Sequence, residues 1–177
     1  MNPLLVNAAD LLRRPGSDRV LELTLPLAEI DVVDPARFVA GAEVAVRLKL
    51  ESLSDGIVVV GELQTPWIGT CRRCLLPTSG VAVSDVHELY QRVVSATDAF
   101  EIVGDQLDLT PAVRELVMLD APTTPLCRPD CAGLCPECGI NRNDETCACV
   151  APARDSRWAA LEALGGLTGV GESGTGE

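Results

Sequence analysis

Eight cysteines carry most of the chemistry that this 177-residue chain could perform. They form four close pairs, which are Cys71-x2-Cys74, Cys127-x3-Cys131, Cys135-x2-Cys138 and Cys147-x-Cys149. Close pairs on tight turns are the usual way in which a chain delivers four thiolates to a tetrahedral structural metal ion. The first fourteen residues lack the pattern of a secretory signal, which predicts a cytoplasmic protein. In a reducing compartment, paired cysteines indicate metal ligation or redox chemistry rather than disulfides.

The last four cysteines have the form of a zinc knuckle followed by a returning pair. In the string Cys135-Pro-Glu-Cys-Gly, Pro136 shapes the turn, and Gly139 allows backbone N–H groups to approach the sulfurs. The next pair begins eight residues further along the chain and can return to the same ion. We therefore expect one zinc site, formed by what we call the C-terminal cysteine group: Cys135, Cys138, Cys147 and Cys149.

The remaining cysteines form what we call the split cysteine group: Cys71, Cys74, Cys127 and Cys131. Its two pairs are 52 residues apart, so a second zinc site there would hold the cysteine-rich segment on the preceding core. Arg72 and Arg73 lie between the first two cysteines, where they would offset thiolate charge. Two alternatives stay open. Flanking cations also lower the thiol pKa in redox dithiols, and residues 127–138 could instead hold an iron–sulfur cluster.

The charge balance favours basic partners over generic contact with nucleic acid. The chain has 26 acidic and 14 basic side chains, which gives a net charge of −12. Half of that charge lies in residues 85–120, where eight acidic side chains accompany two basic ones. Such a surface repels phosphate backbones and attracts cations. No apolar run approaches the roughly 20 residues that a membrane-spanning helix needs, so a membrane partner is not expected.

Little in the sequence indicates catalysis. His87 is the single histidine, which excludes histidine-rich catalytic zinc sites, and its place in an apparent strand is typical of a surface residue. Motifs for dinucleotide binding, phosphate binding and zinc proteolysis are missing from the sequence. We therefore expect a protein that is not an enzyme and has no small-molecule substrate.

Alternating apolar residues predict a β-dominated α+β fold, with an antiparallel sheet or small barrel, a short helix, a cysteine-rich zinc-knuckle module and a last short helix. The clearest strand pattern runs over residues 43–51, and Ser54-Asp55-Gly56 predicts the turn of a hairpin over residues 43–63. Other strands are expected over residues 20–25, 67–71 and 81–94, with a weaker candidate over 28–33. Residues 95–108 read as an acidic loop, and Thr110-Pro111 predicts a helix start.

These patterns divide the chain into four expected parts. They are a β-rich core with one helix over residues 1–122, a cysteine-rich metal-binding module over 123–150, a helix over 151–164 and a disordered tail over 165–177. The tail prediction rests on its glycine content, which offers too little apolar surface for a packed structure.

The ordered series of motifs resembles the bacterial DUF177 family, also called YceD or large ribosomal RNA subunit accumulation protein. The matching strings are Cys71-Arg-Arg-Cys-Leu-Leu-Pro, Asp108-Leu-Thr-Pro-Ala-Val-Arg-Glu, Cys131-Ala-Gly-Leu-Cys-Pro-Glu-Cys-Gly-Ile-Asn-Arg-Asn, Cys147-Ala-Cys and Asp155-Ser-Arg-Trp-Ala-Ala-Leu. The resemblance covers roughly residues 5–164, and the full cysteine set is similar to that of actinobacterial members. It implies a non-enzymatic role in the accumulation, processing or assembly of large-subunit (23S) ribosomal RNA.

Combined with the charge distribution, this resemblance predicts an adaptor. The acidic segment 85–120 would bind a basic large-subunit ribosomal protein, while arginines near the cysteines would contact the RNA or its precursor. The candidate contact residues are Arg72, Arg73, Arg128, Arg142, Arg154 and Arg157. One or two zinc ions would stabilise the protein. The alternatives are a thiol-redox or zinc-handling protein that uses Cys71-x2-Cys74, and an interaction module without RNA contact.

Overall fold

The computed structural model describes residues 2–94 and 97–150. The chain divides into two compact units, Met1–Gly133 and Leu134–Glu177, and each is treated by itself below. The helix expected over residues 151–164 and the tail over 165–177 lie outside the described residues. The expected domain boundary between residues 122 and 123 stays a prediction.

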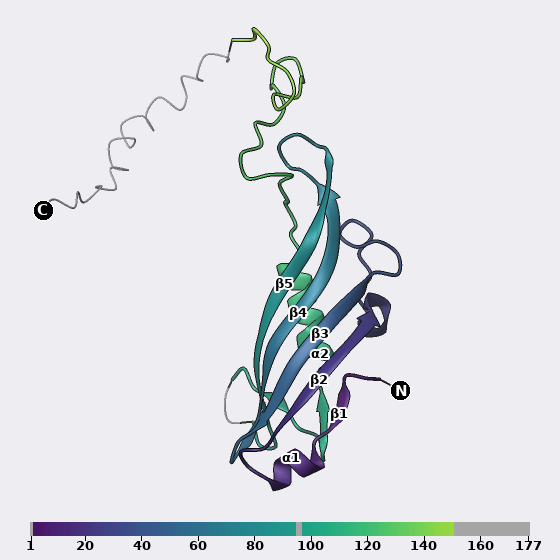
Figure 1. The fold of residues 1–177 in the computed structure, drawn as a ribbon, viewed down its shortest axis with the longest axis vertical. Helices are drawn as coiled ribbons and strands as arrows, with labels where there is room; N and C mark the ends of the chain where they lie inside the picture. The colour runs from purple at the N-terminus through teal and green to yellow at the C-terminus, as the bar shows by residue number, and fades with distance from the viewer. Residues whose placement is uncertain (1, 95–96, 151–177) are drawn as a thin grey trace, which may run out of the picture. The chain divides into compact units, whose positions relative to one another are not determined.

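A five-stranded sheet forms the frame of the first unit, with the strand order β2-β3-β4-β5-β6. Figure 1 labels β2 to β5 of this sheet. Its strands are β2 (Asp18–Pro26), β3 (Glu43–Ser52), β4 (Gly56–Thr70), β5 (Pro77–Gln91) and β6 (Phe100–Glu101). Neighbouring strands are antiparallel except for β5 and β6, which are parallel. A second sheet pairs β1 (Leu5–Asn7) with β7 (Gln106–Asp108). The helical segments are α1 (Ala9–Arg13), the 3-10 turn η1 (Leu27–Ile30) and α2 (Thr110–Asp120).

The core lies on one face of the five-stranded sheet, and the alternation in β3 explains why. Val44, Val46, Leu48 and Leu50 are all at most 2% exposed, and the residues between them point to the other face. Helix α2 packs against β4 and β5 and adds Val113 to the same core cluster. The β-dominated α+β prediction is confirmed, and the strands form an open sheet rather than a barrel among the described residues.

The hairpin expected over residues 43–63 is confirmed, but its second strand is longer than expected. The turn is closed by the backbone N–H of Leu53, which donates to the carbonyl of Gly56 at 2.8 Å. Strand β4 then continues to Thr70, so the strands expected over residues 57–63 and 67–71 are one. Thr65 interrupts the apolar pattern in the sequence, yet it occupies a core position and is 1% exposed. Because a polar residue occupies this core position, the apolar pattern did not predict a single continuous strand.

Two other local predictions are wrong. The strand expected over residues 28–33 is absent, because Leu27 and Ile30 are buried at the three-residue spacing of the turn η1. The acidic loop expected over residues 95–108 contains β6 and β7 among its described residues. Its few apolar side chains, such as the fully buried Leu107, are enough to anchor short strands between exposed acidic residues.

The longest hairpin projects beyond the rest of the sheet. Strand β3 pairs with β4 only as far as Gln64, whereas β4 and β5 stay paired to Thr70 and Pro77 (Figure 1). Near this end the indole of Trp67 lies over Gly80, where an added Cβ would be 2.8 Å from the ring. The turn that follows carries Cys71 and Cys74, so the hairpin determines where the first cysteine pair lies.

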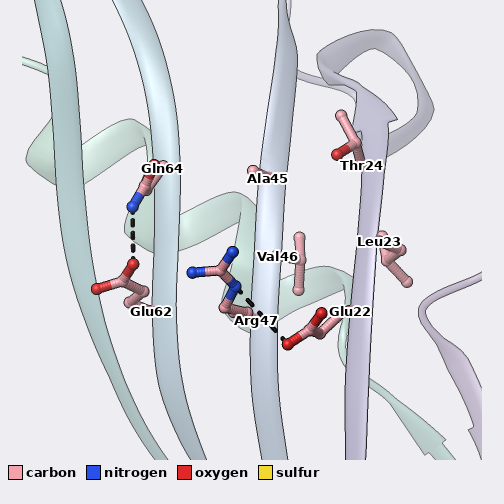
Figure 2. A pocket seen from close by; sticks show the side chains of 8 residues that line it. All are labelled: Glu22, Leu23, Thr24, Ala45, Val46, Arg47, Glu62 and Gln64. Carbon is pink, nitrogen blue, oxygen red and sulfur yellow. Dashed lines mark hydrogen bonds and ion pairs between the residues drawn. The ribbon is translucent and has the colours of Figure 1, made fainter.

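The face of the sheet opposite the core carries charged side chains in cross-strand register. A hollow of about 300 Å³ lies there, and Figure 2 shows three of the side chains that line it, Glu22, Arg47 and Glu62, on three neighbouring strands. The Nε of Arg47 is 3.7 Å from Glu22, and the Nε2 of Gln64 donates to Glu62 at 2.7 Å. Among residues 2–94 and 97–150, no helix combines the length and the apolar character needed to cross a bilayer.

Strands β3 and β4 approach so closely at Gly61 that a side chain there should destabilise the protein. Its φ is +150°, and an added Cβ would be 2.0 Å from the carbonyl oxygen of Arg47. We expect Gly61→Ala to lower the free energy of unfolding by about 2–4 kcal/mol, through backbone strain and overpacking. Gly104→Ala is the matched control, because Gly104 also has a positive φ but open space around it, and it should cost only about 1 kcal/mol. Equal losses in denaturant titrations would contradict this account.

Candidate metal centres

The split cysteine group lies at the end of the projecting hairpin. Cys71 and Cys74 occupy the turn between β4 and β5, and Cys127 and Cys131 follow α2. All four sulfurs lie within 4.8 Å of one another. The Sγ atoms of Cys71 and Cys131 are 3.8 Å apart, and those of Cys74 and Cys127 are 3.6 Å apart. A tetrahedron of sulfurs about 2.3 Å from a central zinc ion has edges of about 3.8 Å, so these spacings fit a single ion.

Backbone hydrogen bonds shape the turn that carries Cys71 and Cys74. The N–H of Cys71 donates to the carbonyl of Leu76 at 2.8 Å, and the N–H of Leu75 donates to the carbonyl of Cys71 at 2.9 Å. Leu75 adopts a left-handed conformation with φ of +60°. The turn is closed by the pairing of Thr70 with Pro77.

The C-terminal cysteine group, which belongs to the second unit, contains the same kind of turn. The N–H of Cys135 donates to the carbonyl of Ile140 at 2.8 Å, and the N–H of Gly139 donates to the carbonyl of Cys135 at 2.9 Å. Gly139 has a φ of +74°, and Leu134 pairs with Asn141 to close the turn. The sulfurs of Cys135, Cys138, Cys147 and Cys149 also lie within 4.8 Å of one another.

The two turns therefore match bond for bond at equivalent positions, a local repeat that the sequence analysis missed. The available signal was the shared form of two cysteines followed two positions later by an aliphatic residue, Leu76 or Ile140. The repeat is obscured because Leu75 occupies the left-handed position that glycine fills in the second turn. A redox dithiol usually opens a helix, and the structure places Cys71 and Cys74 in a hairpin turn instead.

Backbone dipoles and neighbouring thiols set the charge of the split cysteine group. The backbone N–H of Cys74, followed by those of Cys127 and Arg73, outweighs burial and lowers the pKa of Cys71 to about 5. Burial, together with the neighbouring thiols, raises the pKa of Cys127 to about 12. One thiol of the group therefore ionises readily. Ionisation of a second thiol is unfavourable, because its charge would be buried and would lie beside the first thiolate.

The C-terminal cysteine group likewise contains one thiol with a lowered pKa and another with a strongly raised pKa. The backbone N–H groups of Cys138 and Glu137 lower the pKa of Cys135 to about 6. The Cys138 side chain, with burial as a smaller contribution, raises the pKa of Cys149 to about 12. A divalent cation would favour ionisation of the remaining thiols in both groups, because it replaces the protons on the thiols whose pKa values are raised.

The two groups differ in their exposure to solvent. In the split cysteine group, Cys71, Cys74 and Cys131 are at most 3% exposed, and Leu126 packs against them. In the C-terminal cysteine group, only Cys135 is buried, and Cys138 and Cys149 are exposed. The split cysteine group is therefore the more enclosed of the two.

Arg73 holds the two halves of the split cysteine group together through the backbone. Its Nη1 donates to the carbonyl of Cys131 at 2.9 Å and to that of Pro129 at 3.4 Å. Nearby, the N–H of Arg72 donates to the carbonyl of Pro125 at 3.0 Å. Arg73 was expected as a contact residue for RNA or a partner, and this positioning contact was not predicted. Sequence alone gives no signal for it, because the acceptors are carbonyls more than 50 residues away.

The other candidate contact residues lie at the surface where they are described. Arg72, Arg128 and Arg142 are exposed, and the Nε of Arg128 is 3.4 Å from the Oδ1 of Asp130. Arg154 and Arg157 lie outside the described residues. The exposed arginines thus flank both cysteine groups within their own units.

The fold and these sites define a class of protein: a β-sheet protein with two four-cysteine groups, each able to hold a metal ion. Comparison with known proteins then assigns the family. The model of the family described as "Large ribosomal RNA subunit accumulation protein YceD" matches residues 59–165, and the chain belongs to this family. The resemblance drawn from the cysteine motifs is thereby confirmed.

Three mycobacterial relatives are consistent with this assignment. Proteins of Mycobacterium bovis and Mycobacterium tuberculosis are each 34% identical over 179 residues, covering 93% of this chain and 83% of theirs. A Mycobacterium leprae protein is 33% identical over 149 residues, covering 80% of this chain and 68% of its own. All three are described as uncharacterized. No solved structure matches the chain.

Metal stoichiometry tests whether both groups bind. We expect native mass spectrometry of the reduced protein to show two metal ions per chain, one for each four-cysteine group. Cys74→Ser and Cys138→Ser should each lose one ion, and only Cys74→Ser should greatly lower the melting temperature, because it opens the enclosed site. Two ions retained in either variant would contradict the assignment of ligands.

Metal affinity should fall as the solution becomes more acidic. The raised pKa values of Cys127 and Cys149, each about 12, mean that binding must displace protons from these thiols. Lowering the pH from about 8 to about 6 should therefore weaken binding in competition titrations with a chromogenic chelator. An affinity that stays constant over this range would show that the thiols are not the ligands.

Proposed function

We propose that this chain is a non-enzymatic, zinc-stabilised adaptor that supports the accumulation of large-subunit ribosomal RNA. In this role it binds the RNA or its precursor and a basic large-subunit ribosomal protein. The observation that carries the proposal is the pair of closed four-sulfur groups in a member of the YceD family. The family description names accumulation of the RNA rather than a chemical reaction.

We take the metal to be zinc, one of the two metals that four-thiolate sites typically hold. Four cysteine sulfurs within 4.8 Å of one another can surround one ion, and tetrahedral sites with four thiolates are typical of zinc or iron. Four protein ligands leave no open position for water or a substrate, which is the arrangement of structural sites and not of catalytic ones. This supports a scaffold in which the metal fixes loops instead of taking part in a reaction.

The charges near the split cysteine group support a local contact with phosphate. Zinc with four thiolates would carry two negative charges, which repel phosphate. The exposed side chains of Arg72 and Arg128 lie beside this site, offset that charge and can contact a phosphate group. Phosphate contacts by arginine orient a protein on RNA without reading sequence. Because the chain carries a net charge of −12, RNA contact would depend on such local arginines, and a basic protein would contact the acidic segment 85–120.

A variant pair tests the RNA contact. We expect Arg72→Ala/Arg128→Ala to weaken the gel shift of large-subunit ribosomal RNA by about tenfold and to reduce its salt dependence, because two phosphate contacts are lost. The matched control is Arg47→Ala/Lys49→Ala, which removes two cations from the exposed face of β3. Equal weakening by both pairs would show a net-charge effect and contradict the assigned contact.

The exposure of the C-terminal cysteine group favours a second candidate, a zinc-handling protein. Cys138 and Cys149 are exposed, so a chelator or acceptor protein can approach an ion held there. This function requires rapid release of one ion from that group in the presence of a chelator, while the split cysteine group retains its own. Release of both ions only on unfolding would exclude zinc delivery and leave a structural role.

A further inference from the structure

A groove beside α2 combines an apolar floor with a rim of carboxylates. It encloses about 500 Å³ between the helix and the ends of β5 and β6. The wall contributed by α2 consists of Ala112, Glu115, Leu116 and Leu119. Their spacing places them on one side of the helix over about 10 Å, next to the face that Val113 and Val117 bury in the core.

The groove keeps apolar surface in contact with solvent. Leu119 is 69% exposed, although it lies on the same side of α2 as the partly buried Leu116. On the opposite wall, the ring of Phe100 stacks on Tyr90 with centroids 5.1 Å apart, which fixes its position. Leu119, next to the fixed ring of Phe100, therefore offers apolar surface that another molecule can cover.

Three carboxylates surround this apolar surface, and their charges repel one another. Glu88 lies two residues from the buried Val86 and two from the buried Tyr90 along β5, so all three side chains share the core face of the sheet. Burial raises its pKa, and the charges of Glu115 and Asp98 raise it further, against a smaller opposing effect of His87. Among the described residues, none of these three carboxylates forms an ion pair. A cation entering the groove would relieve the repulsion.

We propose that this groove binds a cationic amphipathic segment of a basic ribosomal protein. One lysine or arginine of that segment enters between Glu88 and Glu115, and an adjacent aliphatic side chain covers Leu119. This inference rests on the proposed adaptor function and identifies where its protein partner binds. Charge complementarity decides the class of partner, because the three carboxylates attract a basic segment and repel the phosphates of RNA.

The size of the groove fits a short segment. About 10 Å along α2 accommodates two turns of a helix or three to four extended residues, enough for one cation and one or two apolar contacts. Binding should weaken with salt, because Asp98 and Glu115 are exposed to solvent, while the apolar contact should be insensitive to it.

The test uses the full, metal-loaded chain and a panel of individually purified basic large-subunit ribosomal proteins as probes. We expect at least one of them to bind, and Glu88→Gln/Glu115→Gln to weaken that binding about tenfold or more. Leu119→Ala should weaken it by several-fold without changing the salt dependence. The matched control, Glu22→Gln/Glu62→Gln, removes the same charge from the opposite face of the sheet and should bind as the wild type does. Glu88→Gln relieves repulsion, so the groove variant should remain folded.

The possible results separate this inference from the adaptor function. Binding of a ribosomal protein that is unaffected by the groove variants, or equally weakened by the control pair, would overturn the groove assignment alone. If no basic ribosomal protein bound the wild type, the protein-binding half of the proposed function would fail as well. Loss of RNA binding in the groove variants, with protein binding intact, would assign the groove to RNA and overturn the inference.

Discussion

In each cysteine group, the fold holds four sulfurs so close together that their negative charges would repel one another. Four sulfurs within 4.8 Å of one another cannot all be ionised without a cation, and leaving them protonated forfeits their ability to bind metal. In each group, backbone N–H groups donate to one sulfur, that of Cys71 or Cys135. These hydrogen bonds lower the pKa of Cys71 to about 5 and that of Cys135 to about 6. One thiol in each group therefore ionises readily, and the other thiols would lose their protons when a metal ion binds.

Placement of the split cysteine group depends on the projecting hairpin. Without the continuous β4 and β5, the turn that carries Cys71 and Cys74 would have no fixed position relative to the segment after α2. Arg73 joins these two segments through carbonyl groups, and Gly133 allows the backbone to approach: an added Cβ there would be 2.9 Å from the carbonyl oxygen of Arg73. Hydrogen bonds therefore bring the segments together, and a bound metal would hold them there.

Sequence patterns revealed the elements that alternate and the cysteines that lie close along the chain. The strand over residues 43–51 was predictable because buried and exposed residues alternate there without interruption. The continuity of β4 was not, because Thr65 is polar at a core position. Close pairing and knuckle spacing indicated how the eight cysteines divide into two groups, and the structure brings together the sulfurs of each. The contact of Arg73 and the groove beside α2 could not be predicted, since both depend on residues brought together only by tertiary packing.

X-ray absorption at the zinc edge of the purified, reduced protein would identify the ligands in both cysteine groups. We expect four sulfur neighbours at about 2.3 Å around each ion, with no oxygen or nitrogen ligand and no second metal nearby. A mixed shell with oxygen or nitrogen, or a short metal–metal distance, would contradict the claim that each cysteine group encloses one zinc ion through four thiolates.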